Sequence, residues 1–139
     1  MLVVIVGSGQ MGVQVANQLS REGKSLILVD KEENAFANLS TDFSGFRIVG
    51  DATQIEVLRQ AKVDQADLLL VLTGDDNINL TVGQIGKKFL KAKHTVARVF
   101  APDKEKIFHK LGLDTICPTR QAVEVLMQNF DQYTDSGPQ

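Results

Sequence analysis

The chain has 139 residues, 43% hydrophobic and 23% charged, with a formal net charge of −2. This length predicts one domain with a buried core, and the slightly acidic balance excludes a protein that neutralises duplex phosphates with a basic face. No apolar run approaches the ~20 residues that cross a bilayer, so we expect no direct insertion into a membrane. Because the first strand begins at residue 2, we expect no secretory signal. The one cysteine, Cys117, excludes an internal disulfide and favours a cytoplasmic location, and we expect it to be buried at a strand end.

Short apolar runs rich in Val, Ile and Leu alternate with helical patterns along the chain. The predicted strands are Leu2–Val6, Ser25–Asp30, Phe46–Val49, Leu68–Thr73, Thr95–Val99 and Asp114–Cys117. Strands that alternate with helices at this spacing form parallel sheets through right-handed crossovers. The sequence therefore predicts a Rossmann fold, an α/β domain with a doubly wound parallel six-stranded sheet, over residues 1–132. The polar residues 133–139 are expected to be a disordered tail.

Apolar stripes at helical spacing predict the helices between the strands. Met11, Val15 and Leu19 form one stripe, and Ile78, Val82, Ile85 and Phe89 form another. Gly23 and Gly112 stand where helices are expected to stop. The residues Thr53 and Glu56 fit a capping box that starts a helix.

The first predicted strand runs directly into a Gly-x-Gly-x-x-Gly turn. Its residues are Gly7, Ser8, Gly9, Gln10, Met11 and Gly12. In this context Gly7 permits the tight turn, Gly9 lets the backbone approach a pyrophosphate, and Gly12 lets the following helix pack close to the strand. The N–H groups at the start of that helix favour a phosphate. We therefore expect the whole turn to bind a nucleotide, rather than to be a strand–helix turn that merely needs glycine.

Asp30 ends the second strand and is expected to accept hydrogen bonds from a ribose diol. A carboxylate repels a 2′-phosphate, so NAD(H) or an adenine nucleotide (AMP, ADP or ATP) is favoured over NADP, although the cation of Lys31 reduces this preference. The alternative for Asp30 is a solvated turn residue.

The third and fourth strands end in polar segments at the same edge of the predicted sheet. Asp51 and Ala52 follow the third strand, where Asp51 either meets the adenine amino group or orders its loop. Thr73, Gly74 and Asp75 follow the fourth strand and are expected to line the crevice. Capping of the next helix by Asp75 or Asp76 is the alternative.

Arg98 lies in an otherwise apolar strand, and a guanidinium is costly to bury without a partner. Two partners are considered, a ligand phosphate and a buried carboxylate such as Asp75. The last predicted helix, 119–130, is apolar over more than one stripe. This breadth favours burial on two sides, by the sheet and by a partner subunit, with ordinary packing of a terminal helix as the alternative.

Several segments together resemble one family, the TrkA N-terminal or RCK (KTN) domains, regulators of potassium conductance. The matching segments are Gly7–Gly12, Asp30, Gly50–Thr53, Asp67–Thr73, Ala97–Val99 and Leu111–Pro118. The resemblance implies a cytoplasmic regulatory subunit or domain that binds NAD(H) or ADP/ATP. It also implies dimers, assembled into rings, that act on a membrane-embedded potassium channel or transporter and hold the domain at the inner face of the membrane.

Two features depart from the full pattern of that family. Members that favour ATP resemble one another in having arginine at the position of Gln10, whereas Gln10 resembles the NAD-type members. Full regulators carry a further C-terminal domain, so this chain is expected to be a fragment or a stand-alone subunit.

The alternative function is an NAD-dependent oxidoreductase fragment, which needs a general acid or base beside the nicotinamide. The segment 73–79 contains no His, Tyr or Lys, and His94 and His109 are expected away from the crevice. We therefore predict no enzymatic activity. A third reading, an assembly scaffold with a vestigial site, fits poorly with intact glycines and Asp30.

Overall fold

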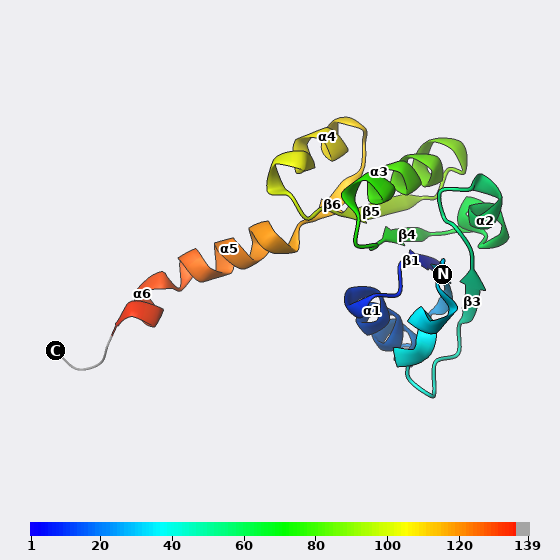
Figure 1. Ribbon diagram of the computed structural model, residues 1–139, viewed down its shortest axis with the longest axis horizontal. Coiled ribbons are helices and arrows are strands. Elements are labelled where there is room, and N and C mark those ends of the chain that lie inside the picture. The colour runs from blue at the N-terminus through cyan, green and yellow to red at the C-terminus, as the bar shows by residue number, and fades with distance from the viewer. Residues whose placement is uncertain (136–139) are drawn as a thin grey trace.

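Six parallel strands form one sheet in the order β3-β2-β1-β4-β5-β6 (Figure 1). The computed structural model describes residues 1–135. The strands are β1 (Leu2–Val6), β2 (Ser25–Asp30), β3 (Phe46–Val49), β4 (Leu68–Val71), β5 (His94–Arg98) and β6 (Asp114–Ile116). This order reverses direction between β1 and β4, which makes the sheet doubly wound and confirms the predicted Rossmann fold.

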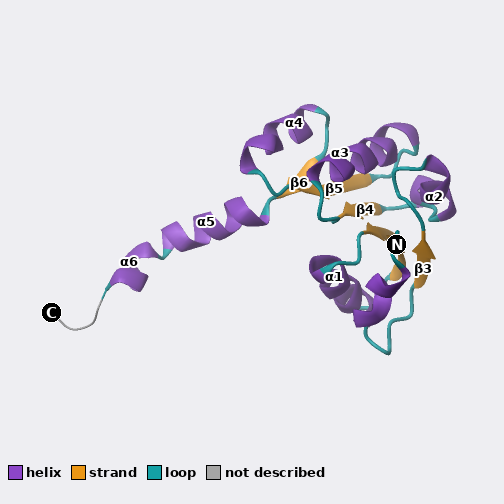
Figure 2. Cartoon of the chain, in the orientation of Figure 1, coloured by secondary structure: helices purple, strands orange, loops and turns teal. Residues whose placement is uncertain are grey.

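Helices cover both faces of the sheet (Figure 2). One face packs against α1 (Gln10–Arg21) and the 3-10 helix η1 (Glu33–Asn38). The other packs against α2 (Ile55–Gln60), η2 (Val63–Gln65), α3 (Asp76–Gln84) with its π-helical continuation η3 (Ile85–Phe89), and α4 (Glu105–Lys110) after η4 (Pro102–Lys104). The chain ends in α5 (Pro118–Gln128) and α6 (Phe130–Thr134).

The central strand β1 supplies both halves of the core. Val4 and Val6 pack into the cluster under α2, α3 and α4, and Val3 and Ile5 pack into the cluster under α1. All four are at most 2% exposed. Burial of such a side chain contributes about 1.5–3 kcal/mol relative to exposure, so the strand that leads into the glycine turn is firmly held.

The structure corrects four predictions on the elements. First, the bounds of three strands differ from the prediction. Strands 68–73 and 114–117 end at Val71 and Ile116, because the chain leaves the sheet earlier, and strand 95–99 lies one residue earlier, at His94–Arg98. Phe89, expected on the buried stripe, is 72% exposed because the π-helical turn rotates it outward. The capping box is absent, since Thr53 bonds to Asp51 and α2 begins after Gln54 without a side-chain cap.

The fourth correction concerns the last helix, expected to pack on the sheet. No residue of α5 is buried, and the helix runs outward from the body (Figure 1). Its first turn is held to α4 by Arg120, whose Nε donates to Glu105 Oε1 at 2.6 Å, and the axis points away from there. Of the predicted tail, Tyr133 and Thr134 are helical residues of α6, and residues 136–139 lie outside the described range.

The helix ends are as predicted at two glycines. Gly23 and Gly112 adopt φ of +79° and +81° after α1 and α4, a conformation that glycine adopts without strain. Within residues 1–135, no helix combines the length and the apolar character needed to cross a membrane.

Candidate nucleotide-binding cleft

The glycine turn joins β1 to α1 and is packed so closely that two of its glycines admit no side chain. Gly7 has φ of +103°, and a Cβ there would lie 2.9 Å from the carbonyl carbon of Leu72. A Cβ on Gly12 would lie 1.9 Å from the carbonyl oxygen of Gly7. Beside Gly9, in contrast, a Cβ would meet no protein atom within 4 Å. The turn is therefore compact on its protein side and open at Gly9, where α1 begins.

A cleft of about 260 Å³ lies next to this turn, at the carboxyl ends of the strands. It is lined by Val6, Gly7, Val29, Asp30, Lys31, Gly50, Asp51, Ala52, Thr53, Thr73 and Ile78. Ligands of open parallel sheets bind at such a position, where the strand order reverses. Six of these residues were candidates from the sequence. The other five were missed for three reasons. Val6, Val29 and Gly50 adjoin candidates without a polar signal of their own, Thr53 was assigned to a helix cap, and Ile78 fits an ordinary core stripe.

Asp30 fixes the glycine turn to the end of β2. Its Oδ2 accepts from the N–H and the hydroxyl of Ser8, both at 2.9 Å, and its Oδ1 accepts from the N–H of Glu32 at 2.9 Å. A carboxylate offers about four acceptor positions, so three are already used within the protein. Asp30 is therefore a structural anchor of the turn, and its role toward a ribose stays a prediction.

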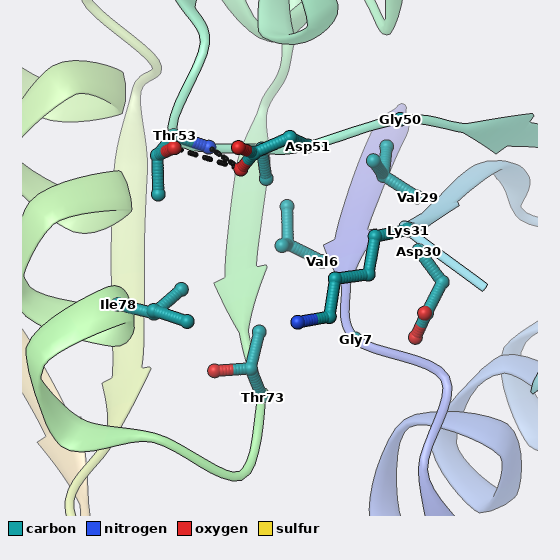
Figure 3. A pocket seen from close by; sticks show the side chains of 11 residues that line it. Val6, Gly7, Val29, Asp30, Lys31, Gly50, Asp51, Thr53, Thr73 and Ile78 are labelled. Atoms are coloured by element: carbon teal, nitrogen blue, oxygen red, sulfur yellow. Dashed lines mark hydrogen bonds between the residues drawn. The ribbon is translucent and has the colours of Figure 1, made fainter.

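Lys31 and Asp51 place opposite charges at the cleft. The side chain of Lys31 points across the cleft toward Gly7 and Thr73 (Figure 3). Asp51 Oδ1 accepts from the N–H of Thr53 at 2.9 Å and from its hydroxyl at 2.7 Å. These hydrogen bonds, with a smaller contribution from the charge of Lys31, lower the pKa of Asp51. Asp51 is thus an anion at neutral pH that orders its own loop, one of its two predicted roles.

The remaining candidates do not line this cleft. Ser8, Gly9 and Gln10 line a neighbouring groove between α1 and η1, of about 600 Å³. Gly74 and Asp75 line a separate shallow hollow near Phe100. The candidates that line none of these three hollows are Met11, Gly12 and Arg98.

Arg98 does not pair with Asp75, the carboxylate expected from the sequence, and its contact with a ligand phosphate stays a prediction. Its Nη2 donates to the carbonyl oxygens of Leu72 and Thr73, each at 2.8 Å, and its guanidinium stacks 4.6 Å from the ring centre of Phe100. Burial lowers the pKa of Arg98, and the charge of Asp76 offsets this in part. Asp75 instead caps α3, accepting from the N–H groups of Asn77 and Ile78. Arg98 therefore supplies the hydrogen-bond donor that the carbonyl oxygens after β4 need, and it stabilises the turn between β4 and α3.

A buried asparagine completes that support, and no pattern in the sequence indicated it. Asn79 is 0% exposed. Its Oδ1 accepts from the N–H and hydroxyl of Thr73, and its Nδ2 donates to the carbonyls of Thr73 at 3.0 Å and Arg98 at 2.9 Å. Thr73, which lines the cleft, is therefore held by α3 and β5 together.

Both histidines lie away from the cleft, as predicted. His94 begins β5, at the edge of the sheet opposite to the cleft. His109 lies in α4, where its Nε2 is 2.8 Å from the hydroxyl oxygen of Thr115. In residues 1–135, no cluster of His, Cys, Asp or Glu is suited to a metal ion.

The sheet order, the glycine turn and the cleft define a Rossmann-type α/β domain. The chain matches the sequence pattern of the TrkA-N domain over residues 3–119, and it belongs to this family. A Trk system potassium uptake protein TrkA homolog from Methanothermobacter thermautotrophicus is 35% identical over 127 residues, which cover 91% of this chain and 58% of the relative. The chain thus spans little more than half the length of such relatives.

Solved structures with the same fold include the GsuK channel. GsuK bound to NAD superposes with a TM-score of 0.79 at 26% identity, over 97% of this chain and 24% of that one. GsuK bound to ADP gives a TM-score of 0.80 at 26% identity, over 95% of this chain and 34% of that one. These relatives confirm the family resemblance drawn from the motifs.

Proposed function

We propose that this chain is a nucleotide-sensing regulatory domain of a potassium channel or transporter, and that it binds NAD(H) or an adenine nucleotide. The observation that carries the proposal is the glycine turn anchored by Asp30 and open at Gly9, beside a cleft at the reversal of the sheet. The TrkA relatives and the NAD- and ADP-bound GsuK structures support the same conclusion.

The ligand is assigned to the cleft by the chemistry of its walls. The pyrophosphate approaches Gly9 and the N–H groups of the first turn of α1, where the helix dipole favours an anion. The ribose reaches the remaining acceptor position of Asp30, and the adenine lies toward Asp51 and Ala52. Lys31 supplies a mobile cation for the phosphates. Ser8 and Gln10 extend the site on the α1 side.

A regulatory role fits the chain better than hydride transfer. A dehydrogenase needs a proton donor or acceptor beside the nicotinamide. His94 lies at the opposite edge of the sheet, and His109 is engaged with Thr115. We therefore propose that the bound nucleotide acts as a signal and is not turned over.

Nucleotide binding is tested by thermal unfolding with NAD⁺, NADH, NADPH, AMP, ADP and ATP. A ligand at 100 times its dissociation constant adds about 2.7 kcal/mol, which raises the melting temperature by several degrees. Asp30→Ala is expected to abolish the shift, measured against the variant's own ligand-free melting temperature. Asp64→Ala, an exposed carboxylate far from the cleft, serves as the control. Absence of a shift with all six nucleotides refutes the proposal.

We further propose that two copies form a homodimer through α5 and that dimers assemble into a ring. In this proposal α5 couples nucleotide binding to a membrane-embedded partner at the cytoplasmic face. Two observations support the dimer. On the α1 side of the sheet, apolar side chains of β4, β5 and β6 are only partly buried, namely Leu68, Leu70, Val96 and Ile116. The projecting helices expose Val123, Val125, Leu126, Met127 and Phe130, all by 50% or more. A ligand shifts such an assembly only by its differential affinity for two arrangements.

The dimer is tested by sedimentation. Residues 1–118 alone, and the full chain carrying Leu126→Asp, are expected to sediment as monomers that still bind nucleotide. Gln121→Asp, an exposed polar position on the same helix, is the control. A dimer that survives both the truncation and Leu126→Asp contradicts the assignment of α5.

A further inference from the structure

Exposed apolar side chains gather at the edge of the sheet where the six strands begin, which we call the amino edge. Met1 is 74% exposed, Phe46 73% and Phe89 72%, the three highest values among the large hydrophobic side chains of residues 1–135. Met1 precedes β1, Phe46 begins β3, and Phe89 closes η3 just before β5. This edge lies at the opposite ends of the strands from the nucleotide cleft, so the proposed function does not account for these side chains.

Lysines lie between these apolar side chains. The exposed lysines of the amino edge include Lys24, Lys62, Lys88, Lys91 and Lys93. Of these five, Lys93 alone has an ion-pair partner in the described structure, Asp67 at 3.1 Å. Together with Asp67, the amino edge carries the carboxylates Glu22, Asp64 and Asp114. The five lysines and Arg21, which ends α1, outnumber these four carboxylates. The carboxyl edge carries Asp30, Asp51, Asp75 and Asp76 against Lys31 and Lys104, so the cations of this acidic chain prevail at the amino edge.

Two of these lysines occupy strained backbone positions. Lys62 and Lys91 have φ of +61° and +60° at the ends of α2 and η3, where the corresponding ends of α1 and α4 have Gly23 and Gly112. A left-handed conformation is strained for a residue with a Cβ. A cation near a helix carboxyl end is favourable. This effect alone explains neither the strained backbone of the two lysines nor the three exposed apolar side chains at the same edge.

We propose that the amino edge binds the surface of an anionic lipid bilayer. Lysines attract the negative headgroups within a Debye length, and the methyl and phenyl groups of Met1, Phe46 and Phe89 enter the boundary between headgroups and acyl chains. The long aliphatic stems of the lysines extend toward the headgroups while their ammonium groups meet the phosphates.

The spread of these side chains favours a bilayer over an acidic protein. The apolar groups stand singly at β1, β3 and η3, separated by cations, across the width of the sheet. A protein partner is bound by a contiguous apolar centre with a polar rim, whereas a fluid lipid surface accepts separate anchors. In an assembly with several copies, the weak attraction of each amino edge adds to that of the others.

The binding is tested with fluorescence, because the chain has no tryptophan. Phe89→Trp and Phe46→Trp each place one reporter at the amino edge, and Val49→Trp places one at the carboxyl end of β3, where Val49 is 53% exposed. With vesicles of equal parts phosphatidylglycerol and phosphatidylcholine, at low ionic strength and without nucleotide, both amino-edge reporters are expected to shift to shorter wavelength. Val49→Trp is expected to keep its emission.

The contribution of charge is measured by vesicle co-sedimentation of the full chain. Lys62→Gly with Lys91→Gly removes two charges and relieves the strained backbone, so the fold is retained. Each lysine near an anionic surface contributes about fivefold to partitioning, and the double variant is therefore expected to bind roughly 25-fold more weakly. Lys104→Gln with Lys106→Gln, which removes two charges near the start of α4, is the matched control and is expected to bind like the parent chain.

Three outcomes overturn the proposal. They are no spectral shift with anionic vesicles, an equal shift with pure phosphatidylcholine vesicles, and an equal loss of binding in the two lysine pairs. The first outcome would leave an acidic protein as the occupant of the edge. Since no nucleotide is present, failure here is distinct from failure of nucleotide sensing.

Discussion

Asn79 connects the candidate cleft to the rest of the sheet, and its replacement by leucine removes that connection with little change in volume. The N–H of Thr73 then loses its acceptor at 3.1 Å, and the carbonyl of Arg98 loses its donor at 2.9 Å. The carbonyl of Thr73 keeps the bond from Arg98 Nη2 at 2.8 Å. Two backbone groups are therefore left without these partners in a buried place.

The size of the effect follows from those two groups. A buried polar group left unpaired costs about 1–3 kcal/mol, so Asn79→Leu is expected to lower the free energy of unfolding by about 2–6 kcal/mol. A domain of this size has about 5–15 kcal/mol in total. At about 3 °C per kcal/mol, the melting temperature falls by about 6–18 °C.

Urea and thermal unfolding followed by circular dichroism measure this loss. Asn77→Leu is the matched control, because Asn77 is exposed in the same helix and is expected to change stability by less than about 0.5 kcal/mol. If Asn79→Leu unfolds at the same urea concentration as the parent chain, or if both variants lose stability equally, the argument from buried hydrogen bonds is wrong.

Three further substitutions are expected to act through contacts described above. Gly12→Ala forces a Cβ to 1.9 Å from the carbonyl oxygen of Gly7 and should cost more than about 3 kcal/mol in unfolding free energy; an unchanged urea midpoint contradicts it. The hydrogen bond from Arg120 keeps the pKa of Glu105 below its ordinary value, so the stabilisation is present above the ordinary pKa and is lost as pH falls through the lowered pKa. The urea midpoint of Glu105→Gln should therefore vary less with acid pH than that of the parent chain. Parallel pH curves for the two proteins would refute this. Lys91→Gly should raise the melting temperature, because glycine relieves the positive φ; a decrease would show that no strain is stored there.

The sheet and the glycine turn could be predicted because local patterns determine them. Uninterrupted apolar runs such as Leu2–Val6 are typical of strands covered on both faces, and the turn after β1 has a spacing that few other structures need. The first residues of β1, β2 and β3 agree with the sequence prediction for that reason. The strand ends were less accurate, since Thr73 leaves the sheet to bond with Asn79, a contact six residues away that no periodicity reveals.

The roles of charged residues depended on geometry that the sequence does not contain. Asp75 was one expected partner of Arg98, but the guanidinium meets two backbone carbonyls and the ring of Phe100 instead. The π-helical turn that exposes Phe89 was equally unforeseen, because one extra residue in a turn changes the direction of every later side chain. The nucleotide contacts of the cleft residues remain predictions.

The outward course of α5 gives the chain two separate thermodynamic units. A helix of fewer than about 12–15 residues without tertiary contacts is marginal in water. α5 has 11 residues, none of them buried, and beyond its first turn, which Arg120 holds to Glu105, it projects from the body. Its backbone amides are expected to exchange with deuterium nearly as fast as those of an unfolded peptide, while those of β1 exchange only on global unfolding. Slow exchange along α5 would therefore report directly that another surface has covered it, and the exchange rate would rise on dilution if that surface is a second copy.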